Sequence, residues 1–342
     1  MPLFNHPRAK KLIAETIDRL ELSLAGLHIF TEAASNNFVV TPIIAAMAGA
    51  ESVAAIARDS AYGSFKQIRE ETLQLAEYCG ISSRLEVVSH KEQALLDRAD
   101  IVTNLGFVRP LDADTIAMIK PGAVIPLMFE KWESRPGEID LELCRRKNIS
   151  VVATNEDQSL VNVFNYMGSL ALKMVLDGAI ELYKSRLAVI GRDKFAKAVH
   201  SLLSAMGLHI EHFSSLNGVM ERAMLGSLDA LIIADYVSQE LIIGAGGQIE
   251  AEELARLAPT LTVIPLCGEI DVVGIKDNGI RIHPEHCQPY RMSRTLAYLG
   301  PRPVIELHAA GLKSAELALK RKIRNLTVKE SRLWSELAEL IV

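Results

Sequence analysis

Short apolar runs alternate with longer amphipathic stretches along most of the chain, and this alternation predicts two α/β halves. Apolar runs of this length are typical of buried strands, and apolar residues at helical spacing are typical of helices. The first half has expected strands at 27–31, 53–57, 85–89, 101–104, 123–128 and 149–153. The second half has them at 187–190, 209–213, 230–234, 262–266 and 304–307. Strands that alternate with helices predict a doubly wound parallel sheet in each half.

A long helix is expected between the halves, over residues 161–183, because this stretch is apolar on nearly every side. A helix of this kind is usually packed between layers or domains. We therefore expect two Rossmann-like or flavodoxin-like domains joined by an interdomain helix. The first would comprise residues 1–160, completed by 290–342, and the second 161–289. A final helix is expected over 313–340.

Two segments of the chain are similar to each other. One begins at Asp100, continues as a strand and a helix, and reaches a Val-Ile-Pro-Leu run at Val124. The other begins at Asp229 and reaches the same four residues at Val263. Because the elements also follow in the same order, the repeat favours internal duplication or pseudo-symmetry over chance similarity.

Composition narrows the possible functions. Hydrophobic residues make up 49% of the chain, and the net charge of -5 comes without a basic block, so a nucleic-acid partner is not expected. The four cysteines form no C-x-x-C pair and match no zinc pattern, which favours reduced thiols, a cytoplasmic location and no bound metal. The N-terminus lacks the features of a signal peptide, and no apolar run has the length of a membrane span.

Ligands of open α/β sheets bind beyond the carboxyl ends of the strands, so the loops at those positions are the candidate sites. In the first half, Arg58 and Ser60 follow the second expected strand, where they can hold a phosphate or serve as an ordinary solvated loop. Thr103 and Asn104 end another strand and offer donors and acceptors to a cofactor. Arg109 follows as a cation that can hold a carboxylate.

The second half offers a weaker phosphate loop and a histidine. Gly191 and Arg192 follow the strand 187–190, where a glycine-rich fingerprint is expected, but Gly191 is the fingerprint's one remaining glycine. His308 ends the expected strand 304–307, where it can act as an acid or base or be a structural residue. Glu269 is a carboxylate that can orient such a histidine.

Residues 98–315 resemble the D-isomer-specific 2-hydroxyacid dehydrogenases. The similar segments are 140–155, the helix 161–183, the strand that leads to Gly191, and the run that starts at His308. This resemblance implies an NAD or NADP site in a cleft between two domains, a homodimer, and His308 as the catalytic acid/base. The chain departs from the family in its reduced glycine fingerprint and in the absence of an arginine near residues 267–269.

A second resemblance covers residues 99–129, which are similar to the cofactor domain of adenosylhomocysteine hydrolase-like proteins. In that case the first half would hold the nucleotide, with Arg58 and Asn104 near it.

The sequence therefore predicts an NAD(P)-dependent oxidoreductase that acts on a small carboxylate-bearing metabolite. In it, His308, Arg109 and Glu269 would be the catalytic residues, and Arg58, Ser60, Thr103, Asn104, Gly191 and Arg192 would bind the cofactor. Two alternatives remain open. One is a nucleotide-sugar transferase with twin Rossmann domains, and the other is a non-catalytic metabolite-binding protein in which the motifs have degenerated.

Overall fold

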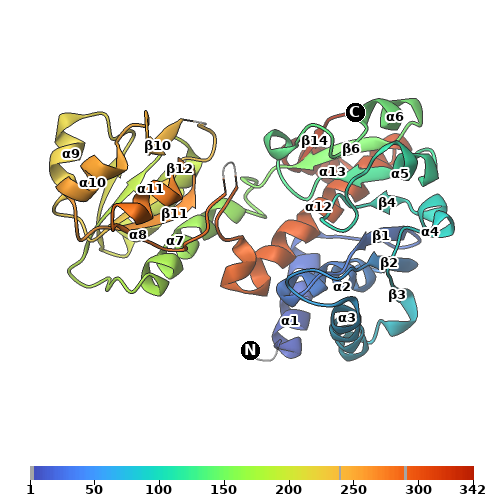
Figure 1. Ribbon diagram of the computed structural model, residues 1–342. Helices are drawn as coiled ribbons and strands as arrows, with labels where there is room; N and C mark the ends of the chain where they lie inside the picture. The colour runs from blue at the N-terminus through green and yellow to red at the C-terminus, as the bar shows by residue number, and fades with distance from the viewer. Residues whose placement is uncertain (1–3, 239, 289–290) are drawn as a thin grey trace. The chain divides into compact units, whose positions relative to one another are not determined.

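The computed structural model describes residues 4–238, 240–288 and 291–342, which form two compact units. Unit 1 combines the chain up to Val163 with the segment Gly300–Val342, and unit 2 is Phe164–Leu299 (Figure 1). The boundary expected between the second domain and the C-terminal segment falls at residues 289 and 290, which lie outside the described residues.

Unit 1 is built on a seven-stranded sheet of order β14-β6-β5-β4-β1-β2-β3. Its strands are β1 (His28–Glu32), β2 (Ser52–Ile56), β3 (Leu85–Val88), β4 (Ile101–Val102), β5 (Val124–Pro126), β6 (Ser150–Thr154) and β14 (Ala338–Leu340). All neighbours are parallel except β14, which pairs antiparallel with β6. The six parallel strands have the Rossmann order 3-2-1-4-5-6, so β2 and β3 lie on one side of β1, and β4, β5 and β6 lie on the other. The switch point of unit 1 is the place between β1 and β4 where the strand order reverses.

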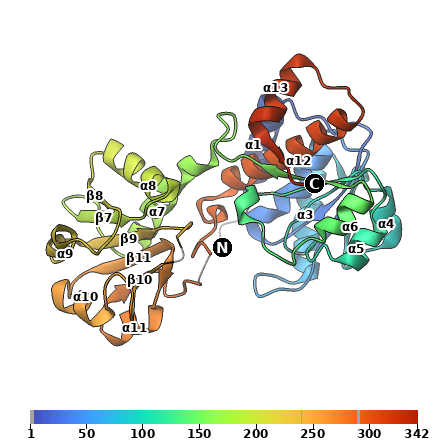
Figure 2. The same ribbon diagram turned by 90° about the horizontal axis from the view of Figure 1, so that it is seen from above.

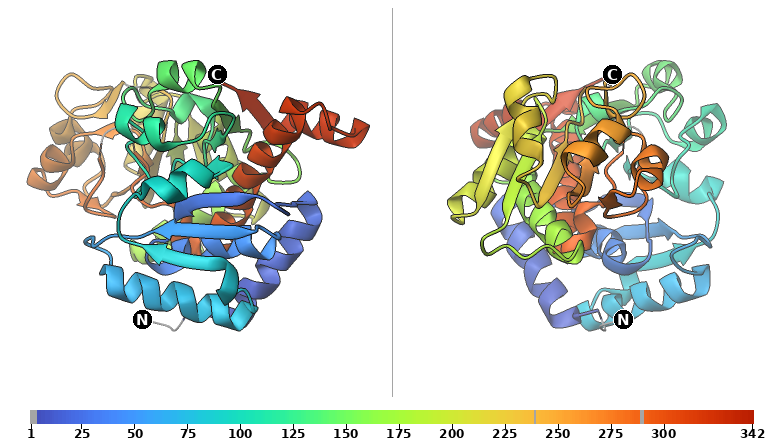
Figure 3. Two further views of the ribbon diagram at one scale, coloured as in Figure 1. Left: turned by 90° about the vertical axis from the view of Figure 1, so that its right-hand side faces the viewer. Right: turned by 60° about the vertical axis from the view of Figure 1, so that its left-hand side comes forward.

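Helices cover both faces of this sheet. They are α1 (His6–Leu20), α2 (Val40–Met47), α3 (Phe65–Cys79), α4 (Gln93–Arg98), α5 (Ala113–Met118), α6 (Leu141–Arg146), α12 (Pro301–Lys322) and α13 (Val328–Leu337), with 3-10 turns η1 (Asn36–Val39), η2 (Ser82–Arg84) and η3 (Lys131–Glu133). Leu96, Ile116 and Cys144 from α4, α5 and α6 share one buried cluster with the sheet. α2 packs on β1 and β2, while α12 packs on β5 and β6. The C-terminal segment, drawn in red, ends at β14 (Figure 3).

Unit 2 has a five-stranded parallel sheet of order β13-β11-β9-β7-β8 and a small sheet of β10 and β12. The strands are β7 (Arg186–Ile190), β8 (His209–Phe213), β9 (Ala230–Ala234), β10 (Leu241–Ile243), β11 (Thr262–Cys267), β12 (Glu269–Ile270) and β13 (Arg281–Ile282). The helices are α7 (Tyr166–Asp177), α8 (Lys194–Ala205), α9 (Val219–Leu225), α10 (Ala251–Leu257) and α11 (Val272–Asp277), with turns η4 (Val163–Asn165) and η5 (Leu296–Leu299). The larger sheet has the flavodoxin-like order 2-1-3-4-5, which puts its switch point between β7 and β9.

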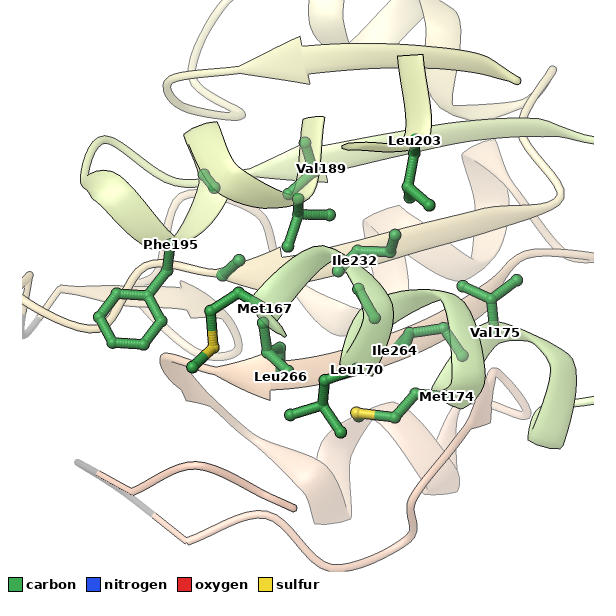
Figure 4. Packing of buried hydrophobic residues seen from close by; sticks show 14 of the residues in the cluster. Met167, Leu170, Met174, Val175, Val189, Phe195, Leu203, Ile232, Ile264 and Leu266 are labelled. Atoms are coloured by element: carbon green, nitrogen blue, oxygen red, sulfur yellow. The ribbon is translucent and has the colours of Figure 1, made fainter. Parts of the chain in front are cut away.

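The strands of unit 2 are apolar on both faces because each face is covered by helices. Val189, Ile232 and Ile264 point to the face where α7 and α8 pack (Figure 4). The residues that precede them in each strand, such as Leu231 and Val263, belong to a second cluster with α10 and α11. Figure 2 shows these two pairs of helices on opposite sides of the sheet. The predicted fold class, two doubly wound α/β domains, is thus confirmed.

Three expected elements differ from the structure. The strand 304–307 is wrong, because these residues belong to α12. A short apolar run does not distinguish a strand from a buried helix, and Pro301 occupies the first helical position, where its fixed φ favours a helix start. The interdomain helix 161–183 is reduced to α7, which ends before Gly178. The final helix 313–340 is interrupted after α12 and closes with β14.

Candidate functional site

Glu32 lies at the carboxyl end of β1, beside the switch point of unit 1. Its side chain is only 7% exposed, and its carboxylate accepts a hydrogen bond from the backbone N–H of Phe107, in the loop after β4. Gly106 allows this approach, since a Cβ there would lie 3.1 Å from Glu32 Oε2. Burial raises the pKa of Glu32, although the Phe107 N–H and the charge of Arg109 oppose the shift. The carboxyl group therefore bridges β1 and β4 and holds its proton more readily than an exposed glutamate.

Thr103 and Asn104 follow β4 at the same edge. The hydroxyl of Thr103 lies 2.9 Å from that of Thr31 in β1, and both residues are fully buried. Asn104 is 1% exposed, and its Oδ1 accepts a hydrogen bond from Met128 N at 2.9 Å. Its Nδ2 is buried without a hydrogen-bond partner in the described structure. An orphaned amide donor at a strand end is a candidate contact for a ligand.

Arg109 lies in the loop after β4, near Glu32. Its Nη1 is 2.7 Å from Glu138 Oε1, and its side chain remains 32% exposed. Its positive charge partly offsets the rise in the pKa of Glu32 that burial causes, which places the two groups in the same electrostatic environment. The structure thus brings Arg109, Thr103 and Asn104 to one edge of unit 1, together with Glu32.

Arg58 and Ser60 lie beyond the carboxyl end of β2, the next strand of the same sheet. Ser60 belongs to a tight turn, in which its Oγ accepts a hydrogen bond from Tyr62 N at 3.1 Å. Arg58 is exposed and makes no hydrogen bond or ion pair with the part of the chain that the structure describes. Its charge is one cause, after burial, of the lowered pKa of Lys91. The cationic side chains of Arg58 and Lys91 therefore both lie at this side of the sheet edge of unit 1.

His308 is not at a strand end, as the sequence suggested, but within α12. It is 4% exposed, its Nδ1 lies 2.6 Å from the Thr41 hydroxyl, and its ring packs near Phe38. Burial lowers the pKa of His308 to about 4. A neutral, buried imidazole with one polar contact favours a structural role.

Gly191 and Arg192 follow β7 in unit 2. A Cβ at position 191 would lie 2.2 Å from the carbonyl oxygen of Ala234, so the glycine is needed for the close approach of β9. Arg192 is engaged in ion pairs with Asp235 (3.4 Å) and Glu240 (3.0 Å). Both residues already have contacts within the protein itself.

Glu269, the third expected catalytic residue, lies in β12 of unit 2. Its Oε2 is buried without a hydrogen-bond partner among the described residues. Burial raises the pKa of Cys287 to about 11, and the charge of Glu269 adds to this shift. Glu269 therefore belongs to unit 2, whereas His308 belongs to unit 1.

In the part of the chain that the structure describes, neither unit offers the glycine-rich cradle in which Rossmann domains hold a dinucleotide. In unit 2, the Asp193 carboxylate already accepts N–H groups of Phe195, Tyr236 and Val237, where a pyrophosphate would need donors. In unit 1, the loop after β1 contains no glycine, and Glu32 bridges the switch point. The residues do not fit a pyrophosphate bound in the usual manner.

The described residues hold neither a metal centre nor a membrane span. No group of three or more His, Cys, Asp or Glu side chains in the described ranges is arranged to hold a metal ion. The same part of the chain contains no helix that is long and apolar enough to cross a membrane.

The two-unit fold is similar to that of known enzymes. A dipicolinate synthase polypeptide from Bacillus halodurans matches with a TM-score of 0.56 and 11% identity over 86% of this chain and 99% of that chain. The corresponding dipicolinate synthase polypeptide from Bacillus subtilis matches with a TM-score of 0.55 and 12% identity over 88% and 99%.

An NAD-complexed D-isomer-specific 2-hydroxyacid dehydrogenase from Lactobacillus delbrueckii ssp. bulgaricus also matches, with a TM-score of 0.42 and 12% identity over 80% and 98%. The likeness that the sequence suggests is confirmed as a likeness of fold, by the two matches with TM-scores above 0.5. No protein-family model and no curated protein matches the sequence.

Sequence reasoning does not single out the two acidic residues of the switch points, Glu32 and Asp193. Glu32 is recognisable there only as part of a polar loop, because its burial depends on the loop after β4, which is distant in sequence. Asp193 is recognisable as an obstacle to pyrophosphate, but its bonds to the loop after β9 join residues 43 and 44 positions apart. The signal that the sequence does contain is an acidic residue shortly after a predicted strand in each half.

Proposed function

We propose that this protein binds a small carboxylate-bearing metabolite at the carboxyl edge of the unit 1 sheet and exchanges a proton with it through Glu32. The observation that carries this proposal is the buried Glu32 at the switch point, with a raised pKa and with Arg109 nearby. Groups with perturbed pKa values at such positions are candidates for acid–base chemistry.

Each residue has a defined task in this proposal. Arg109 would bind the carboxylate of the ligand, with Glu138 as the partner that keeps its guanidinium oriented while the site is empty. Asn104 would donate its unpartnered Nδ2 to a carbonyl or hydroxyl oxygen. Glu32 would give or take the proton, and no cofactor enters these steps.

Calorimetric titration with a panel of 2-hydroxy, 2-oxo and dicarboxylic acids tests this proposal. We expect R109A to weaken binding of the best ligand at least tenfold. R98A is the matched control, because Arg98 also pairs with a glutamate of unit 1, Glu86, at 2.9 Å. E32Q should retain binding and lose its pH dependence. If no acid binds at millimolar concentration, or if R109A and R98A bind equally well, the proposal is wrong.

A second candidate, an NAD(P)-dependent oxidoreductase, is favoured by the Rossmann strand order of unit 1 and by Arg58 after β2. In dinucleotide-binding domains a cation near this position accommodates the 2′-phosphate of NADP. Fluorescence titration with NADH and NADPH tests this candidate. We expect R58A to weaken NADPH binding alone, whereas R69A, which changes an exposed arginine of α3, has no effect. Absence of binding by both nucleotides would exclude it.

The homodimer and the cytoplasmic location expected from the sequence stay predictions. Light scattering after size-exclusion chromatography measures the oligomeric state, and a fluorescent fusion in the source cells reports the location.

A further inference from the structure

The switch point of unit 2 is occupied by a carboxylate side chain of the protein, that of Asp193. Asp193 lies between β7 and α8, and its two carboxylate oxygens face different partners. Oδ1 accepts a hydrogen bond from Phe195 N in the first turn of α8, at 2.9 Å. Oδ2 accepts from Tyr236 N at 2.7 Å and Val237 N at 2.9 Å, in the loop after β9. The carboxylate therefore connects both walls of the switch point.

These donors are the kind that a phosphate uses. Backbone N–H groups at a helix N-terminus and in an adjacent loop bind anions through hydrogen bonds and the helix dipole. Here three of them are directed to one side chain, and the helix that starts there, α8, has 12 residues. A phosphate at this position would meet the negative charge of Asp193, and the three N–H groups would already be occupied by that carboxylate.

The neighbouring residues reinforce this arrangement. Gly191 packs so closely on Ala234 that even a methyl group there would collide with its carbonyl oxygen. Arg192, the cation nearest in sequence, has its charge balanced by Asp235 and Glu240, and it also donates to Ser238. Position 191 therefore has no room for a side chain, and the guanidinium of Arg192 is already engaged in ion pairs.

We propose that Asp193 is an internal substitute for a bound phosphate, which fastens the loop after β9 to α8 and closes unit 2 to nucleotides and other phosphate-bearing ligands. Asp193 is then the residue that determines ligand specificity in this unit, and its removal opens a phosphate site. This inference concerns unit 2 alone and does not depend on the site proposed in unit 1.

Inorganic pyrophosphate is the probe for the test, with calorimetry for affinity and amide hydrogen exchange for location. The full-length D193G protein should bind pyrophosphate at least tenfold more tightly than the wild type, and pyrophosphate should slow exchange at residues 191–196. D271G is the matched control, because Asp271 caps another helix of unit 2, α11, through Gly274 N at 2.9 Å. D271G should bind no better than the wild type.

Two results would overturn the inference. One is a wild-type protein in which pyrophosphate or NADH slows exchange at residues 191–196. The other is a folded D193G protein that binds pyrophosphate no better than the wild type.

D193N provides a second measurement if D193G does not fold. An asparagine has one acceptor oxygen, so it can keep the contact with α8 or with the loop after β9, but not with both. Exchange should then accelerate either at Phe195 or at Tyr236 and Val237. Unchanged exchange at all three amides would contradict the proposal that Asp193 fastens the loop after β9 to α8.

Discussion

The carboxylate of Asp229 accepts a hydrogen bond from the backbone N–H of Arg186 at 2.7 Å, which joins the starts of β9 and β7. In unit 1, Asp100 accepts one from His28 N at 2.8 Å and joins β4 and β1 in the same way. Both aspartates begin the two similar segments of the sequence. The repeat therefore has a structural counterpart, because each aspartate lies at the amino end of the pair of strands that flanks a switch point.

Gly191 allows a first prediction on stability. G191A would place a methyl carbon 2.2 Å from Ala234 O and 2.9 Å from Ala196 Cβ, so backbone has to move. We expect the free energy of unfolding to fall by about 3 kcal/mol. G207A is the control, since Gly207 has φ +78° and a Cβ added there would have no atom within 4 Å, and it should cost only about 1 kcal/mol. Urea denaturation measures both, and equal losses would disprove the close-contact argument.

A buried ion pair on α12 gives a second prediction. Lys313 and Glu316 are each 2% exposed, and Lys313 Nζ lies 2.9 Å from Glu316 Oε2. Lys313 also donates to the carbonyl of Glu21 at 2.8 Å. K313M leaves a buried carboxylate with one partner fewer, so we expect a loss of about 3 kcal/mol in urea denaturation. K329A, which breaks an exposed pair with Glu21, should leave stability unchanged. A loss no larger in K313M than in K329A would contradict this.

The fold was predictable because its signals are local. Apolar runs such as 187–190 and 230–234 are long enough to mark buried strands, and both are strands of unit 2. The segment 304–307 shows where this approach fails. Its apolar residues are buried by contacts of α12 with α1, α2 and the sheet, which are distant in sequence, and the run itself is compatible with either element.

The site was predictable only in part, for a similar reason. The positions of Thr103, Asn104 and Arg109 at one edge of unit 1 are predictable because strand ends can be located from the sequence. The properties of Glu32 depend on burial by the loop after β4, and those of His308 on its contact with Thr41. Such contacts join residues 75 and 267 positions apart, which no local pattern reveals.

Glu32 gives a prediction on pH dependence. Because burial raises its pKa in the folded protein above the ordinary value of 4.5, the folded state binds its proton more tightly than the unfolded state. Its contribution to stability is therefore present at low pH and is lost as the pH rises through the folded pKa. E32Q lacks this titration, so the difference in unfolding free energy between wild type and E32Q should grow in favour of E32Q from pH 4.5 upward. Denaturation curves across this range test it, and a constant difference would show that the pKa is not raised.

His308 should have the opposite dependence. Its pKa of about 4 in the folded protein lies below the value of 6.5 for an exposed histidine, so the unfolded state takes up the proton first as the pH falls. Stability is fully present above pH 6.5 and declines toward pH 4, by about 3 kcal/mol for a shift of this size. H308Q carries no titrating ring and should lack this part of the acid sensitivity, while T41V, which removes the hydroxyl partner, should keep it. Urea denaturation at several pH values between about 7.5 and 4 measures the three proteins. Equal acid sensitivity in wild type and H308Q would mean that the imidazole is accessible to protons in the folded state, and would restore His308 as a candidate acid or base.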